Sequence, residues 1–307
     1  MQKIRVASLA LAFSLASVSP GAESSSPKID KAKWETFLRY AEGYTSGVKF
    51  NIDDPKPTSI PGYFEVVVHL SNGDSKLDRS YYVGADGQSI LNGTLWDLRQ
   101  PPFAENLKKL PTSGYSFGPE DAPISIVVFS DFQCPYCSEL AKTMRTELPK
   151  KYGDKVHVIF KDFPLTTRHP WARAASESAH CLGEQKADAF WAFHDWIFAH
   201  QQEVSLTNLR EKTLAIAKEQ KLDEGKVASC LDNHEPSGEI DKSIELARSL
   251  QVAQTPTFFV NGRIETGALP WDRLSALLDF ELNRPKEFAP AGADKCCEVV
   301  IPKVGQK

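Results

Sequence analysis

The pattern of apolar and polar residues over 28–98 predicts a small α+β domain. Apolar side chains recur at helical spacing between about residues 31 and 42. β-Rich runs separated by tight-turn pairs follow, as is typical of an antiparallel meander. The helix face comprises Trp34, Phe37, Leu38 and Ala41, the strands are 63–70, 80–83 and 89–91, and the turns are Asn72-Gly73 and Asp86-Gly87. This domain has no cysteine and no compact polar cluster of catalytic type, so we interpret it as a packing domain.

A second domain is predicted from residue 118 to 283, where strands alternate with helices in an α/β order. Proline and glycine punctuate residues 99–117, which are predicted to be the linker. The predicted strands are 124–129, 156–160, 257–260 and 263–266, and the predicted helices begin near Cys134 and at Trp271, the latter ending at Leu282. A long helical stretch at about 165–250 separates the second strand from the third and predicts a helical insertion.

Two thiols lie where the first of these strands gives way to a helix, in the sequence Cys134-Pro135-Tyr136-Cys137. Thiolate is the nucleophilic form of cysteine, and the free amides and dipole of a helix N-terminus favour a negative sulfur there. We therefore expect Cys134 to attack or be attacked first. Cys137, one turn further along, is placed to resolve the mixed disulfide.

Composition is that of a soluble protein with two folded domains, since hydrophobic residues make up 41% and charged residues 25% of 307 residues. The formal net charge is -4, which does not suggest nucleic acid or an anionic membrane surface as a partner.

Residues 1–22 are predicted to be a signal peptide. Lys3 and Arg5 precede an apolar stretch from Val6 to Val18, which is followed by small residues. A membrane anchor is the alternative, but the stretch is shorter than the roughly 20 apolar residues that span a bilayer. We therefore expect a periplasmic or otherwise exported protein, in which thiols usually end as disulfides.

The six cysteines allow 15 pairings, so spacing alone does not assign them. Cys296 and Cys297 are adjacent in a polar tail, 284–307, and three interpretations stay open: a labile vicinal disulfide, bridges to another chain, or a soft-metal site. An accessory role in electron relay is a further hypothesis. His194 and His200 lie in an aromatic-rich helix and are interpreted as part of the insertion core, so we predict no metal site.

Four stretches together resemble the DsbA family of exported thiol-disulfide oxidoreductases. They are GPEDAP at 118–123, FSDFQCPYC at 129–137, DFPL at 162–165 with His169-Pro170, and TPTFFVNG at 255–262. The resemblance implies a thioredoxin-like fold with an inserted helical subdomain, here preceded by the small α+β domain. It also implies that the enzyme needs no cofactor beyond a redox-active Cys134–Cys137 disulfide.

The resemblance also assigns roles to residues outside the cysteine pair. A proline at the head of a buried strand is unusual, and a cis bond is one reason to keep it there. In the family, Thr255 and a cis Pro256 hold the client chain as an added strand at Cys134, beside Pro135 and Tyr136. Cys181 and Cys230 are expected to form a structural disulfide that pins two helices, with a second redox-active pair as the alternative.

Three positions depart from the family pattern. Val128 stands where many relatives have a buried Glu that helps to move the proton of the second thiol, and water, Lys161 or Glu139 are the candidates to replace it. Gln254 stands where a small residue often precedes Thr-Pro. Tyr136 replaces the His of strong oxidants, so strong oxidising power is not implied.

The function implied is disulfide formation or exchange in unfolded or partly folded exported proteins, with a membrane redox partner. The alternative is a disulfide isomerase or reductase with chaperone activity, because the isomerases DsbC and DsbG also place a small dimerisation domain first, which would make a homodimer here. Two hypotheses of another class are a chaperone or binding module with structural cysteines, and a metal carrier that uses Cys134 and Cys137.

Overall fold

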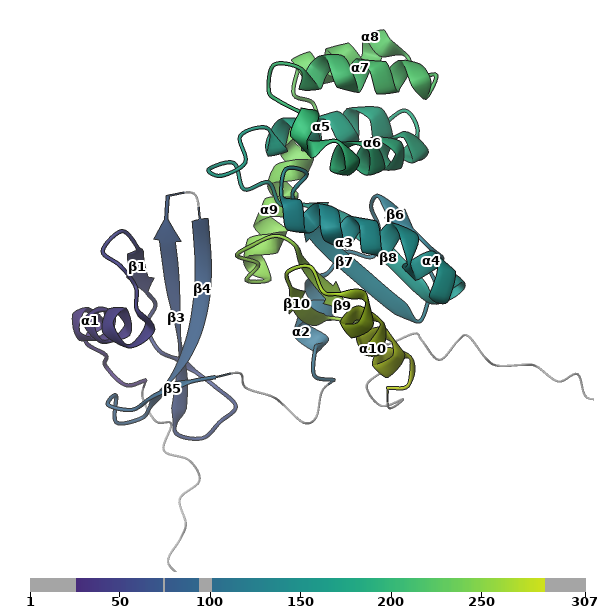
Figure 1. Cartoon of the computed structure of the whole chain (residues 1–307). Helices are drawn as coiled ribbons and strands as arrows, with labels where there is room; N and C mark the ends of the chain where they lie inside the picture. Colours follow the sequence, from purple (N-terminus) through teal and green to yellow (C-terminus); the bar gives the residue numbers. More distant parts are fainter. Residues whose placement is uncertain (1–25, 74, 94–100, 285–307) are drawn as a thin grey trace, which may run out of the picture. The chain divides into compact units, whose positions relative to one another are not determined.

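The computed structural model describes residues 26–73, 75–93 and 101–284, which form two separate five-stranded sheets. The predicted signal peptide (1–22) and the tail cysteines Cys296 and Cys297 lie outside the described residues. Each sheet forms a module with its own helices, and the two are called the N-terminal module and the C-terminal module (Figure 1).

The N-terminal module consists of one helix and a mostly antiparallel sheet. Its elements are α1 (Lys31–Glu42), β1 (Lys49–Ile52), β2 (Lys56–Pro57), β3 (Tyr63–Asn72), β4 (Ser75–Gly84) and β5 (Ile90–Asn92). The strand order is β1-β3-β4-β5, with β2 paired to β3. α1 begins at Asp30, whose carboxylate accepts from the amides of Ala32 and Lys33, and it ends at Gly43 in the left-handed conformation. Alternate residues of β3 are buried, and Trp34 of α1 meets Tyr81 of β4 edge to face.

The C-terminal module has a mixed sheet of order β10-β9-β7-β8-β6. Its strands are β6 (Ser116–Phe117), β7 (Ile124–Ser130), β8 (Val156–Asp162), β9 (Thr257–Val260) and β10 (Arg263–Thr266). β7 and β8 are parallel, and β9 is antiparallel to β7. Parallel neighbours need a crossover connection, and α3 (Pro135–Thr146), α4 (Leu148–Lys151) and a short 3-10 turn provide it. The two carboxyl ends of β7 and β8 therefore lie at one edge of the sheet, beside the start of α3.

Helices cover both faces of this sheet (Figure 1). One face packs on α3 and α10 (Trp271–Leu282), where Leu140, Met144, Leu274 and Leu278 join the buried strand residues. The other face packs on α9 (Ser237–Ser249) and the residues after it. These layers, with the helical insertion, confirm the predicted α/β thioredoxin-like fold.

Part of the predicted linker is folded against the C-terminal module. Residues 99–117 include α2 (Ala104–Lys109) and β6, the latter paired with the edge of β8. The Asn106 amide donates to the Gly262 carbonyl at 2.8 Å. Proline-rich spacing marks where regular structure is interrupted, but it does not exclude a short helix or a two-residue edge strand between the prolines.

The insertion consists of α5 (Ala172–Gly183), α6 (Ala187–Ala199), α7 (Leu209–Glu219) and α8 (Glu224–Asp232), with a 3-10 turn at Gln201–Glu203. These helices stand beyond the carboxyl ends of β7 and β8 (Figure 1). Their buried side chains form one core with Phe132, Cys134, Cys137 and Phe160, so the insertion and the cysteine pair share a hydrophobic cluster. Among the residues described, no helix has the length and apolar character needed to cross a bilayer.

A disulfide joins Cys181 of α5 to Cys230 of α8, with the two Cα atoms 5.8 Å apart. The bridge closes a loop of 49 residues. A crosslink that closes a loop of this length lowers the conformational entropy of the unfolded chain. This stabilises the folded state by about 4 kcal/mol. We expect Cys181→Ala, Cys230→Ala to lower the free energy of unfolding by about that amount in urea titrations, with the rate of thiol exchange at Cys134 unchanged. An unaltered unfolding midpoint would contradict a stabilising role.

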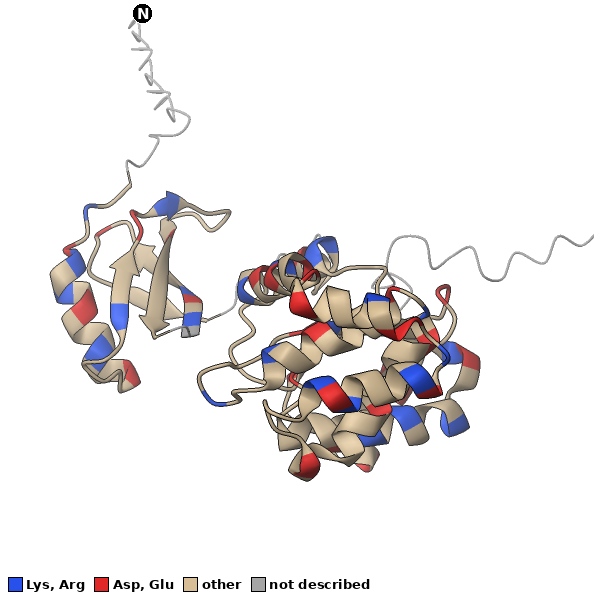
Figure 2. Cartoon of the chain, turned by 90° about the horizontal axis from the view of Figure 1, so that it is seen from above, with Lys and Arg blue, Asp and Glu red and all other residues tan. Residues whose placement is uncertain are grey.

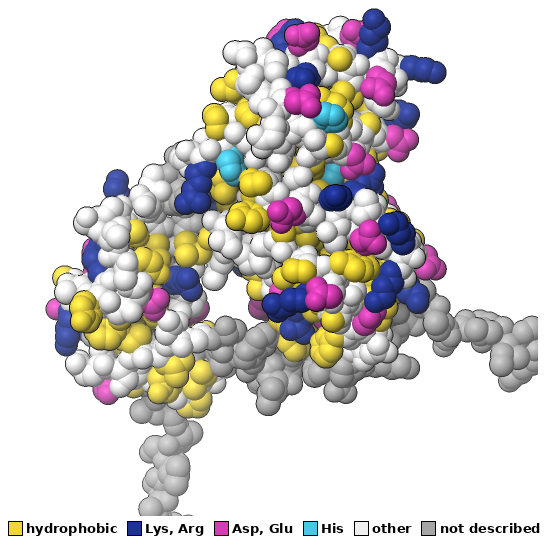
Figure 3. Space-filling model, viewed as in Figure 1, with side chains coloured by type: hydrophobic (Ala, Val, Ile, Leu, Met, Phe, Trp, Pro, Cys, Tyr) yellow, Lys and Arg dark blue, Asp and Glu magenta, His cyan; other side chains and the backbone are white. Residues whose placement is uncertain are grey.

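The surface carries both charge signs. Lys and Arg are interleaved with Asp and Glu on the helices of both modules (Figure 2). On the face shown in Figure 3, hydrophobic side chains reach the surface in small groups between charged ones. The large hydrophobic side chains exposed in the C-terminal module are Tyr136, Leu206, Ile264 and Phe280.

Candidate active site

The two cysteines lie in the first turn of α3. β7 ends at Ser130, the chain turns, and Cys134 caps α3 in an extended conformation with Pro135 as the first helical residue. Proline suits that position because its missing amide would have had no partner in the helix. Cys134 is 4% exposed and Cys137 1%, whereas Tyr136 between them is 60% exposed. Both cysteines are thus buried, Cys137 more completely than Cys134.

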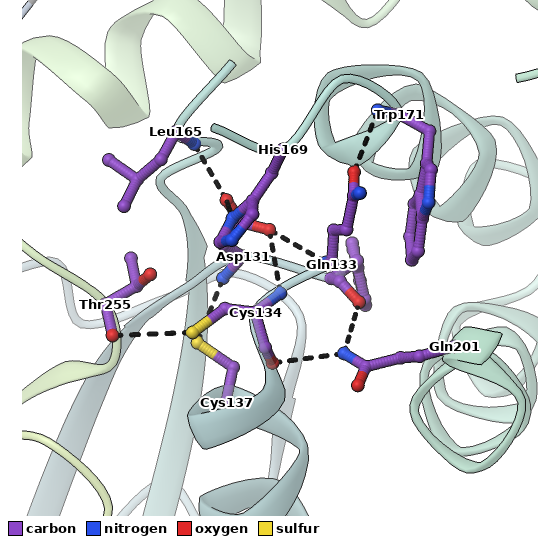
Figure 4. A network of polar contacts seen from close by, with 10 residues as sticks. Asp131, Gln133, Cys134, Cys137, Leu165, His169, Trp171, Gln201 and Thr255 are labelled. Atoms are coloured by element: carbon purple, nitrogen blue, oxygen red, sulfur yellow. Dashed lines mark hydrogen bonds and ion pairs between the residues drawn. The ribbon is translucent and has the colours of Figure 1, made fainter. Parts of the chain in front are cut away.

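The Cys134 sulfur faces the loop before β9. The Thr255–Pro256 peptide bond is cis, and the Cys134 Sγ lies 3.5 Å from the Thr255 carbonyl oxygen (Figure 4). The buried Thr255 hydroxyl has no hydrogen-bond partner among the described residues, so it is available to donate to the Cys134 sulfur. The Cys137 Sγ accepts from the Asp131 amide at 3.4 Å. The structure thus brings Cys134, Cys137, Thr255 and Pro256 together.

The two thiols have opposite acidities. A hydrogen bond from the Cys137 side chain, helped by the backbone amides of Cys137 and Tyr136 and by Thr255, lowers the pKa of Cys134 to about 6 against the opposing effect of burial. Burial raises the pKa of Cys137 well above its usual range, and the neighbouring Cys134 raises it further. At neutral pH, Cys134 is therefore a thiolate and Cys137 a thiol.

The alkylation rate of Cys134 tests this acidity. In a Cys296→Ser, Cys297→Ser background, the rate with iodoacetamide is expected to rise with pH around a midpoint near 6, because only the thiolate reacts. Cys137→Ala should move the midpoint upward, since it removes the main stabilising hydrogen bond, whereas Cys137→Ser keeps a donor and should move it less. A midpoint near 8.5 in the parent would contradict the assignment.

A buried carboxylate organises the loop before α3. Asp131 is fully buried, and one of its oxygens accepts from the amides of Gln133 (2.7 Å) and Cys134 (3.2 Å). The other oxygen accepts from the Leu165 amide (2.7 Å) and from Nδ1 of His169 (2.8 Å) (Figure 4). The carboxylate therefore fixes the Cys134 backbone to the segment that leads into the insertion.

Two glutamines complete the attachment to the insertion. The Gln133 side-chain oxygen accepts from the Trp171 amide at 2.9 Å. The Gln201 side-chain amide donates to the carbonyls of Phe132 (2.8 Å) and Cys134 (3.0 Å). Asp131, Gln133 and Gln201 were not predicted from the sequence. Only Asp131 gave a local signal, because an Asp side chain in a turn often accepts from the amides two and three residues after it.

Other sequence candidates lie apart from the pair. Cys181 and Cys230 are bonded to each other within the insertion. Within the described residues, Glu184, Cys230 and Glu235 come close enough together to suggest a metal site. Because the Cys230 sulfur is in the disulfide, it has no thiolate to offer a metal, and only two carboxylates remain.

Comparison with known proteins identifies the C-terminal module. A thioredoxin family profile matches residues 111–280. Probable disulfide bond formation protein D of Bacillus cereus is 30% identical over 207 residues, which cover 66% of this chain and 91% of that protein. Disulfide bond formation protein D of Bacillus subtilis is 25% identical over 174 residues, 54% of this chain and 76% of that protein.

The chain also matches a fraction of much longer proteins. The Na(+)/H(+) antiporter NhaA 3 of Salinispora tropica is 37% identical over 159 residues, or 52% of this chain, but the chain spans only 23% of that antiporter.

Solved structures show the same fold. Oxidised BdbD from Bacillus subtilis superposes with a TM-score of 0.51 at 21% identity, covering 58% of this chain and 95% of BdbD. The α-DsbA1 protein of Wolbachia pipientis gives 0.50 at 22% identity, covering 58% of this chain and 96% of that protein.

Proposed function

This chain belongs to the DsbA-like thioredoxin family, and on that basis we propose that it exchanges disulfides with client proteins through Cys134 and Cys137. The observation that carries the proposal is the placement of Cys134 and Cys137 at the start of α3, with the Cys134 Sγ 3.5 Å from the Thr255 carbonyl oxygen; the opposite directions of the two thiol pKa values agree with it. A thiolate next to a protonated thiol is what thiol exchange through a mixed disulfide requires.

The exchange proceeds in two displacements. In the oxidising direction, a client thiolate attacks Cys134 of the Cys134–Cys137 disulfide, and Cys137 leaves as a thiolate that takes up a proton. A second client thiolate then displaces Cys134 and completes the client disulfide. In the reducing direction, the Cys134 thiolate attacks a client disulfide, and Cys137 loses its proton and displaces the client. Thr255, Pro256, Pro135 and Tyr136 hold the client backbone at Cys134.

We place disulfide formation ahead of isomerisation, because the relatives from Bacillus that match most of their own length are named for disulfide bond formation. The clients are unfolded or partly folded exported proteins, and a membrane redox partner renews the disulfide. An isomerase or reductase that dimerises through the N-terminal module is the second candidate, since the site has Tyr136 and an α+β module precedes it.

One comparison tests the direction of exchange. A reduced client and a scrambled client are incubated with equal amounts of protein in a defined glutathione buffer. Fast disulfide formation in the first without rescue of the second supports the oxidase. Rescue of the scrambled client supports the isomerase, and failure of both reactions rejects thiol exchange with clients.

A further inference from the structure

Resolution of the mixed disulfide needs an acceptor for a deeply buried proton. Cys137 is 1% exposed, and burial raises the pKa of its thiol, yet only its thiolate can displace a bound partner. The nearest residues of β7 cannot take this proton, because Val128 is apolar and the Ser130 hydroxyl is too weak a base. The carboxylate of Asp131, whose amide contacts the Cys137 sulfur, already accepts four hydrogen bonds, so the acceptor is sought on another element that reaches Cys137.

A small cavity lies beside Cys137, between α3, the sheet and α6. Its volume is about 20 Å³, which is room for one water molecule. The polar groups on its wall are Cys137, Ser130, Arg145 and His194, and the rest of the lining is apolar or aromatic. Neither Lys161 nor Glu139, the proton carriers suggested by the sequence, borders the cavity. Because the guanidinium of Arg145 does not accept a proton, His194 is the side chain of this lining that can act as the base.

The protonation state of His194 suits an acceptor. Its Nδ1 lies 2.8 Å from Oδ1 of Asp195, which Arg145 holds through Nε at 2.9 Å and a terminal nitrogen at 2.8 Å. Burial opposes ionisation of Asp195, but the hydrogen bonds from His194 and Arg145 outweigh it and lower its pKa to about 2. An ionised carboxylate only accepts, so Nδ1 carries the hydrogen and Nε2 keeps a free lone pair.

His194 is neutral before it accepts a proton. Burial lowers its pKa, and the hydrogen bond to Asp195 opposes that effect. The charged groups around the ring are Asp195 on its own helix and Arg145 on α3, while the lining residues of β7 and β8 (Val128, Ser130, Val158 and Phe160) carry no charge. The adjacent carboxylate favours an imidazolium formed here, while burial and the charge of Arg145 oppose it, so the ring holds the proton only briefly.

The proton also has a way out. On its other side, His194 borders an open groove of about 490 Å³ between α3 and α6, lined by Asp195, Ser138, Lys142 and Thr146 among others. The same side chain thus lines both the cavity that contains Cys137 and the groove between α3 and α6.

We propose that His194 accepts the Cys137 proton, through one water molecule in the cavity, and returns it to solvent through the α3–α6 groove. The Cys137 sulfur then bonds to Cys134, the bond from Cys134 to its partner breaks, and the partner leaves as a thiolate. No further oxidant or reductant is needed, and the reverse step returns the proton to Cys137. This inference rests on the proposed thiol exchange and adds its proton acceptor.

The test follows the two phases of reaction with Ellman's reagent, in a Cys296→Ser, Cys297→Ser background. One equivalent of reagent releases a first thionitrobenzoate when Cys134 attacks and a second when Cys137 displaces the bound half. In the parent, the second phase should be nearly independent of pH from 7 to 8.5. In His194→Asn, the rate of the second phase should be about 100-fold lower at pH 7. This rate should rise tenfold per pH unit, because formation of the Cys137 thiolate then depends on hydroxide.

The first phase shows whether the site is intact, because it reports only on Cys134 and should be unchanged. His234→Asn on the far part of the insertion is the matched control, since His234 has a positive φ that Asn tolerates, and its second phase should equal that of the parent. Asp195→Asn, at a position half exposed, is the second variant and should slow the second phase by roughly tenfold.

Different results reject the inference and the proposed function. A parent-like second phase in both His194→Asn and Asp195→Asn, or a slower one with the pH profile of the parent, overturns the role of His194. Absence of a second phase in the parent itself rejects resolution by Cys137, and with it the proposed function.

Discussion

Cys134→Ser is expected to lower the rate of exchange with a disulfide-containing peptide by about 1000-fold or more. Ser at this position would present a hydroxyl that is not ionised at neutral pH, whereas the hydrogen bonds around Cys134 bring its pKa to about 6. The Cys137 thiol cannot compensate, because it is buried and its pKa is raised. Release of a fluorescent peptide thiol under pseudo-first-order conditions measures the effect.

Cys137→Ser is the matched control for that experiment. It keeps the nucleophile, so the first displacement should proceed at a rate close to that of the parent, but the mixed disulfide should accumulate because nothing resolves it. Equal rates in Cys134→Ser and the parent would show that exchange runs through other cysteines, and would favour a binding module in which this pair is structural.

Asp131→Asn is expected to lower the free energy of unfolding by about 3–5 kcal/mol. Each oxygen of the Asp131 carboxylate accepts two hydrogen bonds. In either orientation of an Asn side chain here, its NH2 group, which can only donate, faces two groups that also donate. His169 can shift its ring proton, but the Leu165 amide cannot, so at least one buried N–H stays without a partner.

Asp188→Asn makes the same chemical change at an exposed position of α6 and should alter stability by less than about 0.5 kcal/mol. Urea titrations of the two variants at pH 7 provide the comparison. If Asp131→Asn unfolds at the same urea concentration as Asp188→Asn, the buried carboxylate does not hold the loop before α3.

Elements with a strong local pattern were predicted well. The helix 31–42 and the strands 257–260 and 263–266 match the structure at both ends, because apolar periodicity and turn residues define them locally. β1 and β2 were missed, since they are short and mostly exposed. β4 begins at Ser75, earlier than predicted, because Lys76, Asp78 and Arg79 have no strand signal. Pairing along β3, a tertiary effect, extends the strand there.

The residues of the site also fall into two groups, those that local motifs predict and those that only the tertiary structure brings together. Cys134, Cys137 and Thr255-Pro256 could be named from motifs. The contacts of Gln133 with Trp171 and of Gln201 with Cys134 join residues 38 and 67 positions apart, so no local pattern reveals them. His194 was interpreted as core, and its ring does pack among Phe132, Phe160 and Phe198. Its place on the cavity wall beside Cys137 depends on the packing of α6 against α3, which no local sequence pattern shows.

The most direct measurement maps the mixed disulfide itself. Cys137→Ser, with the tail cysteines left in place, is incubated with a peptide that contains one disulfide, quenched in acid, digested and analysed by mass spectrometry. We predict that the peptide is recovered on Cys134, because hydrogen bonds lower its pKa to about 6 and make it a thiolate at neutral pH. Recovery of the peptide chiefly on Cys296 or Cys297, with Cys134 unmodified, would contradict the proposed role of Cys134.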